Sequence, residues 1–141
     1  MRILVINGPN LNLVGRREPN IYGSQSFDNY FVELQNMFPD TTLVYFQSNN
    51  EGALLDKLHE VGFDFEGIVA NFGGYSHTSV ALADAVAAIT TPVVEVHISN
   101  IHAREQYRQH SYTAAKSVGS IAGLGLRGYE LAVRFLTESS K

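Results

Sequence analysis

Five short apolar runs alternate with segments of helical spacing, and this alternation constrains what the chain can fold into. The runs are 3–6, 42–47, 67–70, 93–98 and 118–122. Runs of this length that are rich in β-branched residues and end at Gly, Pro, Asn or Ser are typical of strands buried on both faces. The sequence therefore predicts five strands in a parallel sheet.

Apolar residues at helical spacing predict four helices between and after these runs. The expected helices cover 27–38, with Ser24 or Ser26 as cap, 54–61, ended by Gly62, 77–89, and about 129–136. Strands joined by helical crossovers form a parallel sheet with helices on both faces, because such connections are right-handed. At 141 residues, the chain suits a single α/β domain with a flavodoxin-like, doubly wound sheet of order 2-1-3-4-5.

Composition excludes several classes of protein. The chain has no cysteine, which excludes disulfides and thiolate chemistry. Its net charge of −4 argues against a nucleic-acid partner. No apolar run approaches the ~20 residues that span a membrane, and we expect no secretory leader before the first strand. We therefore expect a cytoplasmic enzyme that contacts neither membrane nor nucleic acid.

The segment of about 8–25 has neither helical nor strand periodicity. Long connections inside compact domains are usually lids or binding loops, so we expect an active-site lid here. Arg16 and Arg17 precede Tyr22 in this segment. A guanidinium beside a phenol stabilises the phenolate, which could make Tyr22 a base. The alternative is an ordinary surface loop with solvated charges.

Polar side chains gather where the predicted strands end. They are Asn10, Arg17 and Tyr22 after the first strand, Asn49 and Asn50 after the second, Asn71, Tyr75, Ser76 and His77 after the third, and His97, Ser99, Asn100, His102, Arg104 and Arg108 after the fourth. The carboxyl ends of parallel strands share one edge of the sheet, where ligands bind. Arg16, Arg17, Arg104 and Arg108 lie in these segments of an acidic chain. This edge of the sheet therefore favours a small anionic ligand.

These side chains favour some chemistries over others. The three lysines lie outside the strand ends, which argues against an imine mechanism. No glycine-rich phosphate loop follows the first strand, which argues against a nucleotide ligand. His97, His102 and His110 match no zinc spacing, so we expect no metal.

Proton abstraction next to a carbonyl fits the remaining groups. Tyrosine, with a pKa of about 10, becomes a base near neutral pH only when cations stabilise its anion. His97 could protonate a leaving hydroxyl, and Glu95, on the same strand face, could orient its ring. The alternative for His97 is a structural histidine at the end of the sheet.

Several long motifs resemble type II 3-dehydroquinate dehydratases. The matching segments are 7–13 (NGPNLNL), 15–19 (GRREP) with 22–23, 46–49 (FQSN), 77–82 (HTSVAL) and 95–105 (EVHISNIHARE). They lie in order along nearly the whole chain. The resemblance implies that 3-dehydroquinate loses water by anti elimination through an enolate, with no cofactor.

The resemblance also implies a role for each matching position. Tyr22 would be the base, with Arg17 lowering its pKa, Asn10 would hold a water at the enolate, and His97 would be the acid. The substrate would contact the remaining positions, which are Asn71, His77 and Arg108 for ring hydroxyls and Ile98 and Ser99 for the carboxylate.

Asp84 also matches a substrate-binding position. If His77 and Asp84 shared one helix, they would lie about 10 Å apart along its axis. Asp84 would then complete a neighbouring site, in agreement with the family's dodecamer, a tetramer of trimers. Four positions depart from the family pattern: Asn50, Phe72, Ala83 and Gln109.

Three further readings stay open on the sequence alone. The same reaction serves quinate catabolism as well as the shikimate pathway. A chain of this fold could instead be a binding module for a flavin or another anion. The third alternative is a protein that serves only in assembly, in which the polar residues at the strand ends would have no catalytic or binding role.

Overall fold

A five-stranded parallel sheet of order β2-β1-β3-β4-β5 forms the centre of the molecule. The computed structural model describes residues 1–16, 19–22 and 24–139, with the backbone alone for Pro19, Tyr22 and Ser139. The strands are β1 (Arg2–Asn7), β2 (Thr42–Gln47), β3 (Gly67–Asn71), β4 (Val93–His97) and β5 (Gly119–Ala122). The predicted flavodoxin-like order is confirmed.

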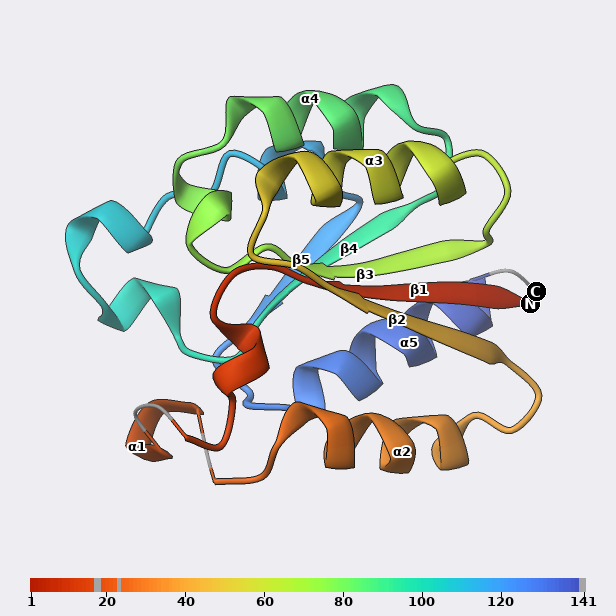
Figure 1. Ribbon diagram of the computed structural model, residues 1–141, viewed down its shortest axis with the longest axis horizontal. Helices are drawn as coiled ribbons and strands as arrows, with labels where there is room; N and C mark the ends of the chain where they lie inside the picture. Colours follow the sequence, from red (N-terminus) through yellow and green to blue (C-terminus); the bar gives the residue numbers. More distant parts are fainter. Residues whose placement is uncertain (17–18, 23, 140–141) are drawn as a thin grey trace.

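Two pairs of helices cover the sheet. Helices α2 (Phe27–Met37) and α5 (Arg127–Ser139) lie on one face, and α3 (Glu51–Val61) and α4 (Val80–Ala88) lie on the other (Figure 1). Each face has its own apolar core, because alternate strand residues point to opposite sides. Ile3 and Val5 pack toward α2 and α5, whereas Leu4 and Ile6 pack toward α3 and α4.

Polar side chains fix where the helices begin. Ser26 is the cap of α2, since its side chain accepts a hydrogen bond from the Asn29 N–H at 3.2 Å. Ser79 caps α4 in the same way, through the Leu82 N–H at 2.9 Å. The predicted start of this helix at residue 77 is therefore wrong. His77 belongs to the preceding 3₁₀ turn, η2 (Gly73–His77), so the assumption that His77 and Asp84 share one helix does not hold.

The segment after β1 is not structureless. It contains a 3₁₀ turn, η1 (Leu11–Leu13), and the short helix α1 (Pro19–Tyr22). Just before this segment, the chain after β1 lies close to the chain after β3. A Cβ at Gly8 would lie only 2.3 Å from the Phe72 carbonyl oxygen. That this segment acts as a lid, and that residues 1–141 form one catalytic domain, stay predictions.

Three further 3₁₀ turns connect β4 to β5. They are η3 (Ile101–Ala103), η4 (Gln106–Arg108) and η5 (Ala114–Lys116). η3 and η4 lie with η1 and η2 around the carboxyl ends of the strands, whereas η5 lies against α4 (Figure 1). None of the helices in the described part of the chain has the length and apolar character that crossing a membrane requires.

Candidate active site

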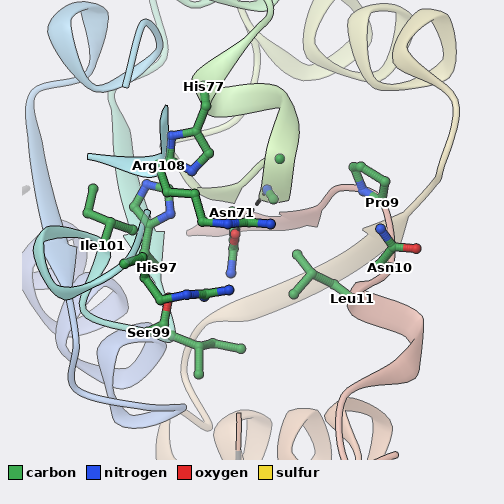
Figure 2. Close-up of a pocket in the computed structure, with 13 residues that line it drawn as sticks. Pro9, Asn10, Leu11, Asn71, His77, His97, Ser99, Ile101 and Arg108 are labelled. Carbon is green, nitrogen blue, oxygen red and sulfur yellow. Dashed lines mark hydrogen bonds between the residues drawn. The ribbon is translucent and has the colours of Figure 1, made fainter. Parts of the chain in front are cut away.

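A pocket of about 140 Å³ opens at the carboxyl edge of the sheet. Three segments line it: Pro9, Asn10 and Leu11 after β1, Asn71, Gly73, Gly74 and His77 from β3 and η2, and His97, Ile98, Ser99, Ile101, Arg104 and Arg108 from β4 to η4. Figure 2 shows the first segment facing the other two across the hollow. Most residues predicted for the site therefore meet in one place.

His97, in the pocket wall, forms a buried acid–base pair with Glu95, which lies behind it. The Nε2 atom of His97 lies 2.7 Å from Oε2 of Glu95, and both residues are buried. A carboxylate can only accept, so Nε2 carries a proton in this contact. The contact confirms the expectation that Glu95, two residues earlier on the strand, reaches the ring.

Two hydroxyl groups hold the other side of the Glu95 carboxylate. Ser111 Oγ donates to Oε2 at 2.6 Å, and Thr113 Oγ1 donates to Oε1. Burial by itself would raise the pKa of Glu95. The hydrogen bonds from His97, Ser111 and Thr113 outweigh burial, and the pKa of this carboxyl lies below its ordinary value. Glu95 is therefore an ionised partner for the His97 ring at neutral pH.

His77 stacks on His97 and is held in one tautomer. The ring centroids lie 5.8 Å apart with an interplanar angle of 25°. His77 Nδ1 donates to the backbone carbonyl of His110 at 2.7 Å, which leaves Nε2 as the acceptor of a neutral ring. Burial, with the nearby His97 and Arg108, lowers the pKa of His77. This ring is suited to accept a hydrogen bond from a ligand hydroxyl.

Arginines form the positive wall of the pocket. Arg104 Nη1 donates to Ser99 Oγ at 3.1 Å, so the Ser99 hydroxyl proton can point to a ligand. Arg108 Nε donates to Oε2 of Glu105 at 2.7 Å. Hydrogen bonds from Tyr107 and Arg108 lower the pKa of Glu105 to about 2. The wall suits a carboxylate with hydroxyl groups nearby.

Asn10 occupies a special backbone position at the rim opposite His97. Its φ of 69° lies in the left-handed region, which asparagine tolerates better than most residues. Its N–H donates to Oδ1 of Asn49 at 3.0 Å, a side chain that Gln47 Nε2 also contacts at 3.2 Å. Contacts from the end of β2 therefore position Asn10.

Three predicted site residues are not seen in the pocket. Arg17 lies outside the described residues, and only the backbone of Tyr22 is described, as the last residue of α1. Asp84 lies exposed on α4 and does not line the pocket of its own chain. That Asp84 completes a neighbouring site stays a prediction.

Sequence reasoning missed several residues of the site. The sequence marks Arg104 only as a cation after the fourth strand, and it gives no signal for the hydroxyls of Ser111 and Thr113. Both hydroxyls lie in a loop without periodicity. The only sequence signal for them is that Glu95, if buried, would need hydrogen-bond donors besides His97. Among the residues that the structure describes, no group of three or more His, Asp or Glu side chains could hold a metal ion.

Nearly the whole chain matches one family. A family model described as "Dehydroquinase class II" matches residues 1–137. The chain belongs to the class II dehydroquinase family. The resemblance seen in the sequence motifs is thus confirmed.

Relatives and solved structures of dehydroquinases agree with this assignment. A 3-dehydroquinate dehydratase from an Exiguobacterium species is 55% identical over 139 residues, which are 98% of this chain and 95% of the relative. A catabolic 3-dehydroquinase from Talaromyces marneffei is 51% identical over 96% of this chain and 78% of its own length. The crystal structure of a type II dehydroquinase from Butyrivibrio crossotus matches with a TM-score of 0.92 and 44% identity, over 97% of each chain.

The departures from the dehydroquinase pattern have local roles in the structure. Asn50 caps α3, because its Oδ1 accepts hydrogen bonds from the N–H groups that begin this helix. Phe72 and Ala83 are buried. Gln109 Nε2 donates to the backbone carbonyl of Arg104 at 3.0 Å. Asn50 and Gln109 thus make local hydrogen bonds, and Phe72 and Ala83 belong to the core.

Proposed function

We propose that this chain is a type II 3-dehydroquinate dehydratase that converts 3-dehydroquinate to 3-dehydroshikimate without a cofactor. One observation carries the proposal: His97, held by a buried and ionised Glu95, faces Asn10 across a pocket whose wall bears two arginines (Figure 2). Relatives from Exiguobacterium and Helicobacter hepaticus bear the name 3-dehydroquinate dehydratase.

The elimination proceeds in two steps. Tyr22, ionised by the Arg17 guanidinium, takes a proton from the carbon next to the ketone, and the bonding electrons move to the ketone oxygen as an enolate. A water held by Asn10 stabilises that oxygen. The enolate then re-forms the ketone, the new carbon–carbon double bond expels the C1 hydroxyl, and His97 gives this group a proton so that it leaves as water.

Binding groups around the pocket hold the ring for this chemistry. The backbone N–H groups of Ile98 and Ser99 and the Ser99 hydroxyl take the carboxylate, and the hydrogen bond from Arg104 to Ser99 supports that orientation. His77 accepts from a ring hydroxyl through Nε2, because its Nδ1 is bound to a backbone carbonyl. Asn71 and Arg108 bind the remaining hydroxyls.

The assembly, the pathway and the location belong to the same proposal. The exposed place of Asp84 on α4 supports a role in a neighbour's site within a dodecamer, a tetramer of trimers. We assign the enzyme to the shikimate pathway and to the cytoplasm. Quinate breakdown is the second candidate, since one relative is named a catabolic 3-dehydroquinase.

The decisive experiment follows the enone chromophore of the product after 3-dehydroquinate is added. We expect turnover that neither a chelator nor borohydride changes. Tyr22→Phe and Arg17→Met should remove nearly all turnover, whereas Tyr112→Phe, a matched change of an exposed tyrosine outside the pocket, should retain it.

Other outcomes separate the alternatives. Full activity of Tyr22→Phe would contradict the assignment of the base alone. A folded wild-type chain that forms no enone would contradict the proposed function. Stabilisation by a flavin without turnover would instead support the anion-binding module.

A further inference from the structure

A line of buried hydrogen bonds reaches from the pocket into the core. The Gly73 N–H donates to Asn71 Oδ1 at 3.1 Å, and Asn71 Nδ2 donates to the Tyr129 hydroxyl at 2.9 Å. The Tyr129 hydroxyl donates to Asn7 Oδ1 at 2.8 Å, and Asn7 Nδ2 lies 3.4 Å from the Tyr45 hydroxyl. We call the side chains of Asn71, Tyr129, Asn7 and Tyr45 the amide–phenol network.

One backbone group sets the direction of every bond in this network. The Gly73 N–H can only donate, so Asn71 must present its oxygen to Gly73 and its amide nitrogen to Tyr129. Tyr129 is fully buried, and burial raises the pKa of its hydroxyl, which therefore keeps its proton. That proton must go to an acceptor, and the Asn7 oxygen is placed to receive it.

The opposite orientation of the Asn71 amide would break the bond to Gly73, because the amide nitrogen would then face the Gly73 N–H. The Tyr129 hydroxyl would also have to turn its proton away from Asn7. Unpaired polar groups in a buried site are costly. The Asn71 side chain is thus locked at the floor of the pocket, with one amide hydrogen used by Tyr129 and the second left for a ligand.

We propose that Tyr129 is a positioning residue that fixes the Asn71 amide so that it donates to a substrate oxygen. This inference rests on the proposed function and extends it to a residue of α5 that does not line the pocket. Asn71 contacts the substrate, and Tyr129 acts only through Asn71. The site would therefore select substrates whose ring places a hydroxyl oxygen next to the Asn71 amide.

The test is Tyr129→Phe, which removes one oxygen and leaves the ring in the core. We expect KM for 3-dehydroquinate to rise about five- to tenfold, the value of one hydrogen bond, with kcat changed less than about twofold. Tyr30→Phe is the matched control. Its ring lies 6.2 Å from that of Tyr129 and is also buried, but its hydroxyl is outside the amide–phenol network. This control should leave KM unchanged.

A double-mutant cycle distinguishes positioning from a general loss of packing. If Tyr129 acts through Asn71, adding Tyr129→Phe to Asn71→Ala should change kcat/KM by less than about 1.5-fold. Independent effects of the two substitutions, or an unchanged KM in folded Tyr129→Phe, would overturn the proposal. Should Tyr129→Phe fail to fold, Asn7→Leu removes the acceptor of the Tyr129 proton and should raise KM in the same way.

The experiment also keeps this inference apart from the proposed function. If wild-type protein does not form the enone, the proposed function fails. If wild-type protein is active and both Tyr129→Phe and Asn7→Leu leave KM unchanged, the function stands and the positioning role is wrong.

Discussion

Glu95 is a fully buried carboxylate whose oxygens accept hydrogen bonds from three side chains, His97, Ser111 and Thr113. Isolated buried charges are unfavourable, and this one is compensated by donors from β4 and from the loop before η5. The same contacts that keep Glu95 ionised also hold the His97 ring in place. Stability and the orientation of the His97 ring therefore depend on one carboxylate.

The lowered pKa of Glu95 predicts how stability changes with pH. Its folded-state pKa lies below the ordinary value of 4.5, so its contribution is fully present above pH 4.5 and is lost as the pH falls through the folded-state pKa. We expect wild-type protein to be more stable to urea than Glu95→Gln at pH 7, with the difference shrinking toward pH 3.

The measurement is the free energy of unfolding of both proteins across this pH range. Because other carboxylates titrate there as well, the difference between the two proteins is the relevant quantity. A difference that stays constant from pH 7 to pH 3 would contradict the prediction.

At the scale of elements, caps decide where the site residues lie. Ser79 begins α4 two residues after the end of η2, so His77 lies in a turn that approaches the pocket rather than on the helix. The carbonyl of His110, from the loop after η4, then fixes the His77 ring. A single serine thus separates a binding segment from a structural helix.

Removal of this cap should weaken both the helix and the turn before it. Ser79→Ala should lower the free energy of unfolding by about 1 kcal/mol, the usual value of an N-cap. We also expect a higher KM, since His77 lies two residues before the cap. Thr78→Ala, at the exposed neighbouring position, is the control and should change stability by less than about 0.5 kcal/mol. Urea denaturation and steady-state kinetics of both variants provide the measurements.

The strands and the long helices could be predicted because apolar spacing and cap residues are local features of the sequence. The β2 run of 42–47 was predicted with its observed bounds, and the stop of α3 at Gly62 was also right. The start of α4 was wrong, because apolar spacing continues through residues that a serine cap separates from the helix. The 3₁₀ turns around the pocket have no periodicity that could have revealed them.

Much of the site could also be predicted, but not its supporting contacts. Asn10, Asn71, His77 and His97 follow strands that end at one edge of the sheet, so topology alone brings them together. Tyr129 lies 58 residues from Asn71 in the sequence. Its helical spacing with other apolar residues indicates only that it belongs to the core. Only the packing of α5 on the sheet brings its hydroxyl to that amide.

At the scale of the whole molecule, one pocket residue is expected from another subunit. If Asp84 serves a neighbour's site, Asp84→Asn and His97→Gln should each be inactive as pure proteins and regain activity when mixed subunits reassemble. In a random one-to-one assembly, about one quarter of the sites would have both an intact His97 and an intact neighbouring Asp84.

Reassembly of each variant with itself is the control for this mixing experiment. Activity of the mixture that does not exceed the sum of the two pure variants would contradict a shared site. Sedimentation of the wild-type chain, expected at the mass of twelve subunits, would give the assembly independently.

The left-handed backbone of Asn10 limits how the entry to the pocket can vary in evolution. A change of side chain there alters both the polar group offered to the substrate and the direction in which the chain leaves β1. Glycine would keep the path but remove the amide, and a β-branched residue would disturb the path itself. Substitution at this position is therefore restricted twice, by backbone conformation and by side-chain chemistry.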